Sequence, residues 1–328
     1  MIKQLIRYFH HNQFVSAIIL VGLVWFLFEI RGILMAVFVA FIIMSAHLPF
    51  VEFLRRNKLP KSISVLIPYL ITGVFILLLI LPLVPFFVSQ IQQLFLRLPF
   101  FIDRAAGIFG LKINASQLND FLVSEFNTIG KNAFVVTSRV FGGLFSVLTI
   151  LVVSFYLLAN NDRIKKNVTG FFPKDRQQKA LETFLLMEEK LGAWLRGQLV
   201  LSASIGVITW IGLTLLGVEF ALPLALIAGI LEVVPTIGPI ISAIPAIIVA
   251  LTVSPTLAFV VAGMYILVQL LENNILVPKI MEKAVGLDPV VIIIGIMIGG
   301  NLLGVLGALL SIPFISMLVI LFKSLTDS

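Results

Sequence analysis

The sequence predicts an all-α, polytopic integral membrane protein. Of its 328 residues, 60% are hydrophobic and 12% are charged, whereas soluble domains are about half apolar and about a quarter charged. The mean hydropathy is +1.13. Long apolar runs follow one another along the whole chain, and a helix needs about 20 apolar residues to cross a bilayer core of about 30 Å.

The basic residues are distributed like those of loops that face anionic membrane lipid. The net charge is +7, but the lysines and arginines gather between apolar runs and form no patch interleaved with stacking aromatics, so we expect no nucleic-acid partner. The chain has no cysteine, and its three histidines, His10, His11 and His47, are too scattered for a metal site. We therefore expect no metal and no cofactor.

The N-terminal region, residues 1–88, is expected to contain three spans. The first apolar run, 14–28, has no small-residue cleavage site after it, so we expect an uncleaved span and no signal peptide. The second run is 33–50. The third, 63–88, contains Pro68, Pro82 and Pro85, which should kink it because each proline removes a backbone donor.

Two amphipathic regions, 89–139 and 160–198, flank a fourth span at 140–159. The first begins with Ile91, Leu94, Phe95 and Leu98 at the i, i+3, i+4, i+7 spacing of a helix, and the second has a similar pattern. Such helices either lie on the membrane surface or pack on a neighbouring subunit. Both alternatives stay open, and we expect a homo-oligomer.

Basic residues in the short loops predict the orientation. They cluster after the second span and after the fourth, which together with Lys3 and Arg7 places the N-terminus and both loops in the cytoplasm and 89–139 on the outer side. The C-terminus, with Lys323, is then cytoplasmic too. The two clusters are Arg55, Arg56, Lys58 and Lys61, and Arg163, Lys165, Lys166, Lys174, Arg176 and Lys179.

The C-terminal part, 199–322, combines spans at 199–218 and 256–271 with two broken apolar segments, 222–250 and 289–322. Both broken segments are interrupted by glycine and proline, and three such positions recur 66 residues later. Paired broken segments are a sequence pointer to a substrate site between two repeats of a transporter. The recurring positions are Pro223, Gly229 and Gly238 in the first segment and Pro289, Gly295 and Gly304 in the second.

Two topologies fit these segments. If each crosses once, the chain has eight spans and 272–288 lies outside. If each is a re-entrant hairpin, there are six full spans and 272–288 lies inside. In that case span 199–218 with its hairpin is repeated, in inverted orientation, as span 256–271 with its own hairpin. Lys279 and Lys283 favour the hairpins because they place 272–288 inside. Pro245 breaks the repeat, since Pro313 lies two residues past its expected counterpart.

Glu232 is the only carboxylate well inside either broken segment, and it precedes the break Pro235-Thr236-Ile237-Gly238-Pro239. A carboxylate is costly in hydrocarbon and should face protein or water. It binds a coupling proton or cation, accepts a hydrogen bond from a polar solute, or caps freed backbone groups. The break itself either holds a ligand at the N-terminus of the returning helix or is a packed kink.

Further polar or flexible positions belong to the same candidate site. In the second segment Gly300, Asn301 and Gly304 form the analogous break, with Asn301 as its polar side chain. A polar cluster ends the sixth span and either lines a pathway or caps the helix at the membrane interface: Gln269, Glu272, Asn273 and Asn274. His47 is a weaker candidate for a proton relay. Trp194 and Arg196 are expected to anchor the fifth span at the interface.

The sequence does not predict an enzyme, because no catalytic motif is present. There is no Gly-Lys-Ser/Thr of a phosphate-binding loop, so ATP hydrolysis within the chain is not expected. Neither Gly-x-Ser-x-Gly nor His-Glu-x-x-His occurs.

Two groups of residues resemble a known family. The first is Phe155-Tyr156-Leu157-Leu158, Pro173 and Trp194-Leu195-Arg196-Gly197-Gln198. The second is Glu232-x-x-Pro235-x-x-Gly238-Pro239 with Pro245, then Pro278, Gly286-Leu287-x-Pro289, and Gly304-x-x-Gly307 with Pro313. With these motifs the chain resembles the autoinducer-2 exporter family over essentially its whole length. The resemblance implies a bacterial inner-membrane secondary transporter, usually with eight spans. Some members are associated with export of autoinducer-2 and others with exchange of sodium or lithium for protons.

The function predicted from these observations is secondary transport of a small polar solute by alternating access. The C-terminal part would move against a scaffold of earlier spans, with Glu232 as the coupling or solute-binding acid and Asn301 as a further contact. One alternative is a sodium (or lithium)/proton antiporter with Glu232 as the ion site. The other is a membrane scaffold whose amphipathic regions recruit partners.

Overall fold

The computed structural model describes residues 13–75, 77, 100, 103–104, 107, 133–234, 237–281 and 288–326. Every regular element among them is a helix, so the all-α class is confirmed for this part of the chain. Four of these helices are long and apolar enough to cross a membrane: Arg31–Arg56, Lys174–Leu215, Pro255–Met281 and Val290–Thr326. A bent pair, Phe145–Ala159 and Asn161–Gly170, makes a fifth if it counts as one span. Shorter apolar helices in the described part of the chain are Leu20–Glu29, Lys61–Phe75, Ala221–Leu231 and Gly238–Val253.

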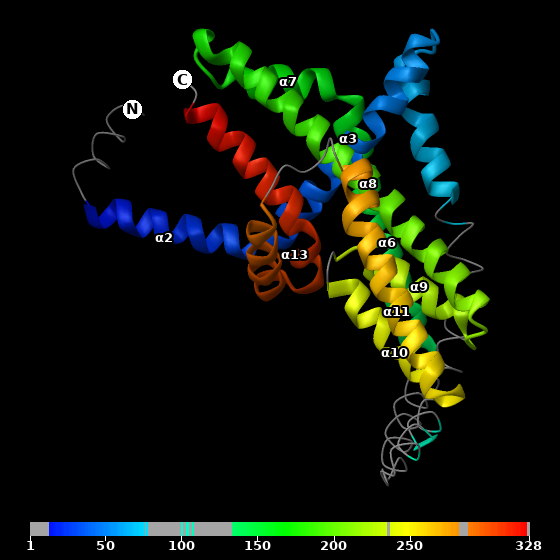
Figure 1. The fold of residues 1–328 in the computed structure, drawn as a ribbon. Coiled ribbons are helices and arrows are strands. Elements are labelled where there is room, and N and C mark those ends of the chain that lie inside the picture. The colour runs from blue at the N-terminus through cyan, green and yellow to red at the C-terminus, as the bar shows by residue number, and fades with distance from the viewer. Residues whose placement is uncertain are drawn as a thin grey trace.

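The N-terminal part consists of α2 (Gln13–Glu29), α3 (Arg31–Arg56) and a helix over Lys61–Phe75. In Figure 1, α2 extends away from the other helices, and its apolar side chains are exposed. These helices cover the predicted spans 14–28 and 33–50 and the first half of 63–88. Most of the predicted amphipathic region 89–139 lies outside the described residues.

A cluster of polar side chains joins α3, helix Lys61–Phe75 and α6 (Ala133–Ala159). The His47 ring stacks on Tyr69 with 4.6 Å between centroids. Its Nε2 lies 2.9 Å from Thr72 Oγ1, and its Nδ1 lies 2.8 Å from the carbonyl of Ile43. The Tyr69 hydroxyl lies 2.6 Å from Ser154 Oγ. Because a carbonyl only accepts, Nδ1 carries a proton, and both ring nitrogens of His47 have a hydrogen-bonding partner.

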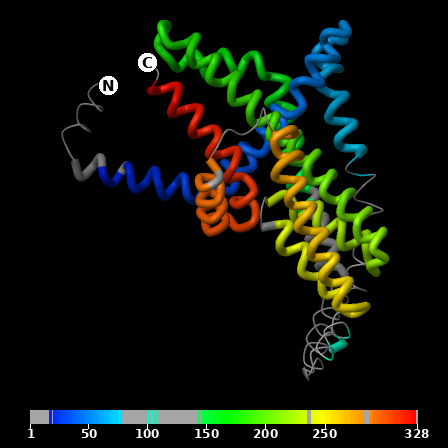
Figure 2. The backbone as a smooth tube through the Cα atoms, viewed as in Figure 1, coloured from blue at the N-terminus to red at the C-terminus, as the bar shows by residue number. Residues whose placement is uncertain are grey.

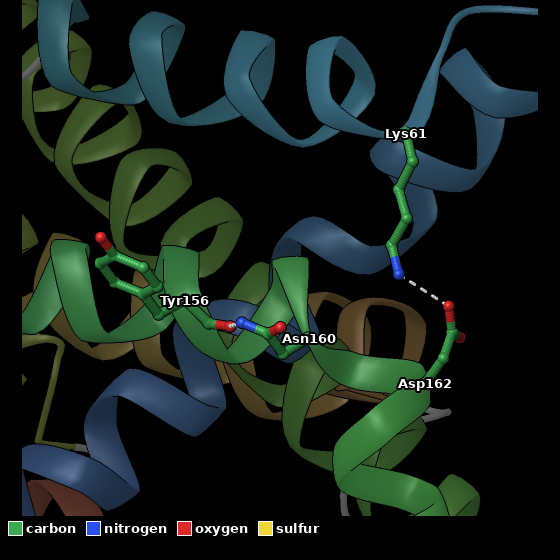
Figure 3. A network of polar contacts seen from close by, with 4 residues as sticks. All are labelled: Lys61, Tyr156, Asn160 and Asp162. Carbon is green, nitrogen blue, oxygen red and sulfur yellow. Dashed lines mark hydrogen bonds and ion pairs between the residues drawn. The ribbon is translucent and has the colours of Figure 1, made fainter.

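The chain turns sharply where α6 meets α7 (Asn161–Gly170), at an angle of 73°. Figure 3 shows the contacts at this corner. The side chain of Asn160 donates to the carbonyl of Tyr156 at 3.0 Å, which also accepts from the backbone N–H of Asn160 at 3.1 Å near the end of α6. The Lys61 ammonium lies 2.7 Å from Asp162 and, by donating to it, holds the pKa of that carboxyl below its ordinary value. This pair ties α7 to helix Lys61–Phe75.

The longest helix, α8 (Gln177–Leu215), follows the short η1 (Lys174–Arg176) and has 39 residues. The sequence divides this stretch into a cytoplasmic linker and a span, but the structure joins both in one uninterrupted helix. Two buried apolar clusters include its side chains. One contains Leu213 with residues of α9, α10 and α11, and the other contains Leu201 with residues of α3 and α13. The core is therefore built around α8.

The contact of α8 with α3 explains part of the Trp194–Gln198 motif. Pro49 lies inside α3 and has no N–H, so it cannot pair with the carbonyl of Ser45 four residues earlier. Arg196 donates to that carbonyl at 3.3 Å and to the carbonyl of Ala46 at 3.1 Å. The approach is close because any side chain at Gly192 would collide with the Ser45 backbone.

The expectation that Trp194 and Arg196 anchor at the membrane interface is therefore wrong. Trp194 is 4% exposed and packs in the cluster shared by α3, α8 and α13. Arg196 is engaged by α3 backbone. Both residues hold helices together.

The first broken segment forms two helices, α9 (Ala221–Leu231) and α10 (Ile237–Val253). They pack against each other, and a side chain at Gly238 would collide with the carbonyl of Leu231. Leu224 of α9 shares a buried cluster with Val249 of α10. The 11 residues of α9 span only about 16 Å at 1.5 Å per residue. The segment therefore folds back on itself as a helical hairpin. The six-span topology with re-entrant hairpins stays a prediction.

The following helix is longer than the predicted span 256–271. It starts as α11 (Pro255–Leu271), passes through the π-helix η2 (Glu272–Leu276) and ends as α12 (Val277–Met281). Ser254 caps its N-terminus by accepting from the backbone N–H of Leu257 at 3.1 Å. The polar residues at 269–274 thus lie within a continuous helix and do not end it.

The second broken segment, α13 (Pro289–Thr326), bends at Gly304, whose φ of 64° and ψ of −147° are not helical. A positive φ of this kind is readily adopted only by glycine. The two legs pack so closely that a side chain at either Gly299 or Gly307 would collide with the backbone of the other. Figure 1 shows the result as a hairpin with its bend at one end and the C-terminus at the other.

In each hairpin the first and last residues lie on the same side of the molecule, and that side differs between the two hairpins. Met281, at the end of α12, lies against Gly197, where the apolar half of α8 begins. At the end of α13, Ser324 Oγ lies 2.7 Å from Thr183 Oγ1 in the polar half of α8. The first leg of α13 runs back along the second, since a side chain at Gly295 would collide with Ile315. Both ends of α13 therefore lie toward the polar half of α8. The α9–α10 hairpin follows the C-terminal end of α8 and precedes the N-terminal end of α11, so both of its ends lie away from the polar half of α8.

The close contact of the two α13 legs predicts a difference between neighbouring glycines. Gly299→Ala should lower the free energy of unfolding by about 1–3 kcal/mol, because the added methyl group forces the legs apart. Gly300→Ala places its Cβ at an ordinary 3.7 Å from Ala308 and should not destabilise the protein. Thermal unfolding of the purified protein in detergent, followed by tryptophan fluorescence, compares the two. Equal melting temperatures for both variants would contradict the hairpin packing.

Candidate functional site

Glu232 lies at the C-terminal end of α9, directly before the break between the two hairpin helices. Its side chain is fully buried, with 0% exposure. The helix ends here because Pro235 cannot supply a backbone N–H and resists helix continuation. A carboxyl group is therefore held inside the protein at the tip of a hairpin made of apolar helices.

The backbone at this tip is fixed by α8. Gln198 is 3% exposed, and its side-chain amide donates to the carbonyl of Glu232 at 2.9 Å. The last carbonyls of a helix have no partner within the helix, and a buried one without a donor is costly. Gln198 thus fixes the position from which the Glu232 side chain extends.

Glu272 is the second buried carboxyl of the site. It is 2% exposed and begins the π-helical segment between α11 and α12. Gln269, about one turn earlier, donates to Glu272 Oε2 at 3.1 Å. π-Helical turns are rare and occur frequently at functional sites. This one places a polar cluster in the middle of an apolar helix.

The buried carboxyl groups of Glu232 and Glu272 lie within electrostatic reach of each other. Within the described part of the chain, no donor from another residue reaches either carboxyl oxygen of Glu232. Two unit charges about 4 Å apart repel by about 4 kcal/mol at an effective dielectric constant of about 20. A proton shared between the two groups, or a bound cation, removes this repulsion.

The structure brings together some of the predicted site residues. Glu232, Gln269 and Glu272 form the acid site described above. Gly238 is buried at the start of α10 against the Leu231 carbonyl, and the carbonyl of Pro239 accepts from Ser242 Oγ at 3.0 Å. Pro235 and Thr236 lie outside the described residues.

Other predicted residues are placed elsewhere. Asn273 and Asn274 are exposed; the first accepts from Gln269 at 3.4 Å, and the second donates to the carbonyl of Leu270 at 2.8 Å. In α13, Gly300 is half-buried, and Asn301 and Gly304 are exposed. The α13 hairpin packs chiefly against α8. His47 contacts Ile43, Tyr69 and Thr72, away from the acid pair.

Sequence reasoning missed two features of this site. It treated Glu232 and Glu272 separately, because residues 40 positions apart show no pairing pattern. It also gave Gln198 no role, although an amide next to an apolar half-helix needs a hydrogen-bond partner if it is buried. A buried acid requires a partner, and that requirement is the signal that points from Glu232 to the nearby polar cluster.

Comparison with known proteins adds the family. The sequence model of the "AI-2E family transporter" group matches residues 14–327. The chain is 28% identical over 306 residues to the "Putative transport protein YrrI" of Bacillus subtilis (strain 168), covering 89% of this chain and 86% of that protein. It is 26% identical over 278 residues to "Putative transport protein YueF" of the same organism, covering 79% and 75%. It is 26% identical over 201 residues to "Putative permease PerM" of Escherichia coli (strain K12), covering 60% and 57%.

The hydrogen bond from Gln198 to the hairpin tip leads to a stability prediction. Gln198→Met keeps the side-chain length but leaves the buried Glu232 carbonyl without a donor, so it should destabilise the protein by about 1–3 kcal/mol. The matched control is Ser204→Ala on the same helix, whose exposed hydroxyl donates only to the Val200 carbonyl of its own helix; it should change stability by less than about 0.5 kcal/mol. Thermal unfolding in detergent measures both, and a Gln198 variant as stable as the control would contradict the bond's importance.

Proposed function

Because the chain belongs to the AI-2E family of transporters, we propose that it is a secondary transporter that moves a small polar solute across the bacterial inner membrane. The observation that carries the proposal is the buried pair of Glu232 and Glu272 at the tip of the α9–α10 hairpin. A multi-pass membrane protein retains buried acids chiefly where they bind ions, protons or polar substrates. The absence of a phosphate-binding loop from the sequence supports coupling to an ion gradient.

The acid pair is the proposed coupling site. With one proton, the two carboxyl groups share a hydrogen bond and the hairpin tip stays seated between α8 and α11. When that proton leaves, the two negative charges repel and favour an arrangement in which the tip and α11 separate and water or solute enters. A proton or ion therefore shifts the equilibrium between two states, as alternating access requires.

A second candidate function is exchange of sodium or lithium for protons. It is favoured by the composition of the site, since two carboxyl groups and the side chain of Gln269 supply oxygen ligands of the kind that hard cations prefer. In this case the cation and the proton compete for the same pair. Autoinducer-2 is one specific solute that the first candidate function could move, and only membership of the family supports it.

The orientation completes the proposal. We place the N-terminus, the C-terminus and the polar half of α8 in the cytoplasm, because the basic loops lie on that side. The α9–α10 hairpin then enters from outside and α13 from inside. The acid pair lies toward the inner face, since Gln198 stands where the apolar half of α8 begins. We keep a homo-oligomer as part of the proposal, with the exposed apolar α2 available to lipid or to a neighbouring subunit.

The coupling role predicts loss of ion-linked transport when either acid is neutralised. In proteoliposomes loaded with a pH-sensitive dye, a sodium gradient or added autoinducer-2 should drive proton movement. Glu232→Gln and Glu272→Gln should each reduce that movement by about tenfold or more, which corresponds to about 1.4 kcal/mol of lost coupling. Glu182→Gln, on the exposed polar half of α8, is the control and should retain it.

The outcomes separate the candidates. Proton movement driven by sodium alone favours the antiporter, and movement driven by autoinducer-2 alone favours solute transport. Normal flux in both variants, with unchanged elution in size-exclusion chromatography, would remove the coupling role. No flux from folded wild-type protein with either probe would favour a scaffold.

The proposed sidedness is tested by cysteine labelling, since the chain has no native cysteine. Lys279→Cys, exposed on α12, should react with a membrane-impermeant maleimide only when the cytoplasmic face is accessible, as in inverted vesicles. Lys58→Cys, in the basic loop after α3, marks the same side. Reaction of Lys279→Cys in intact cells, with Lys58→Cys protected, would replace the two hairpins by the eight-span topology.

A further inference from the structure

An open cavity of about 600 Å³ lies away from the acid pair, where three segments meet. These are the end of α7, the first turns of α8 and the end of α13. Figures 1 and 2 show the C-terminal part of α13 running toward the same end of the molecule as α7 and the start of α8. The hydrogen bond between Thr183 and Ser324 joins two of the segments directly. The volume is within the range of about 300–1,000 Å³ typical of ligand sites.

The cavity has an apolar wall that is continuous with a membrane-spanning helix. Phe172, Phe184, Leu321 and Leu325 contribute to it. Phe172 is 44% exposed and Leu325 is 68% exposed, so the wall is open to the surroundings. Leu321 and Leu325 end the apolar run of α13, where a spanning helix leaves the hydrocarbon and meets the lipid headgroups. The wall therefore adjoins the end of the apolar run of α13.

The rim of the cavity carries two cations, Arg176 and Lys179. Asp175 also lines it, with 3.9 Å between its carboxylate and Arg176 Nε, and both side chains are mostly exposed. An exposed pair at this distance is weak, so an incoming anion can take its place. The hydroxyl groups of Thr183 and Ser324 bond to each other and add no further charge. Basic groups thus lie beside an apolar wall.

We propose that this cavity binds one anionic phospholipid from the adjoining membrane leaflet. The phosphate group lies between Arg176 and Lys179, as phosphate prefers guanidinium and ammonium donors. The upper part of an acyl chain covers Phe172, Phe184, Leu321 and Leu325. A free anion would leave the apolar wall exposed, and a zwitterionic lipid would gain little from the two cations. Basic pockets beside helix ends are a known means of selecting anionic headgroups.

The experiment uses the purified full-length protein in an uncharged detergent. Phosphatidylglycerol, phosphatidylcholine and glycerol 1-phosphate are titrated separately, and native mass spectrometry counts bound molecules while thermal unfolding reports stabilisation. Phosphatidylglycerol should be retained and raise the melting temperature. Phosphatidylcholine, without net charge, and glycerol 1-phosphate, without acyl chains, should do neither.

Three variants locate the site. Arg176→Gln combined with Lys179→Gln should weaken phosphatidylglycerol binding by roughly tenfold or more. Ala180→Phe, which fills the cavity while keeping both cations, should also weaken it. The control, Arg55→Gln combined with Lys58→Gln, removes equal charge from the loop after α3 and should leave binding unchanged.

Several results would overturn the proposal. Equal retention of phosphatidylcholine removes the charge selectivity, and equal stabilisation by glycerol 1-phosphate indicates a free-anion site. Equal weakening by the control variant indicates a general surface charge effect. A change of oligomeric state in the Ala180 variant with unaltered lipid binding assigns the cavity to a protein contact instead.

Discussion

The structure depends on how backbone carbonyls freed by prolines are satisfied inside an apolar protein. Pro49 leaves the Ser45 carbonyl without its helical donor, and the break before Pro235 leaves the Glu232 carbonyl at a helix end. In hydrocarbon an unpaired carbonyl costs several kcal/mol. Two side chains of α8 supply the missing donors, Arg196 to the first and Gln198 to the second. These bonds hold α3 and the α9–α10 hairpin at fixed places along α8. The remaining contacts of α3 and of the hairpin are made around these two fixed points.

The acid pair is a consequence of that placement. Gln198 binds the carbonyl of Glu232 at the hairpin tip, and the Glu232 side chain interacts with Glu272. The π-helical turn at Glu272 presents the second carboxyl. Neither acid needs to be held by a basic residue, since one proton or cation can serve both. The site therefore combines a firmly held backbone with a charge that can change, which suits a coupling element in a transporter.

Much of the fold could be predicted from the sequence, because hydrophobicity and glycine–proline breaks act locally. Apolar runs gave the helices, and the paired interruptions gave both hairpins, with the bend at Gly304 where glycine is required. Long-range partners could not be predicted in the same way. Trp194 was placed at the interface because nothing local shows that α3 and α13 cover it. The polar run beginning at Gln269 was interpreted as a helix end. The sequence does not show that Gln269 donates to Glu272 within the helix, or that Glu272 interacts with Glu232 of another helix. Asn301 was assigned to the site by analogy with the repeat, but its surroundings differ.

Because the chain is synthesised from its N-terminus, the two hydrogen bonds made by Arg196 and Gln198 of α8 can form at different stages of synthesis. Arg196 emerges about 150 residues after the carbonyls of α3 that it binds, so its partners are already in the membrane when α8 arrives. Gln198 meets the opposite situation, because its acceptor is synthesised 34 residues later. Until Glu232 has been synthesised, the backbone acceptor of that amide does not yet exist. The first bond thus belongs to the early helix pair α3–α8, and the second closes only when the transport half is complete.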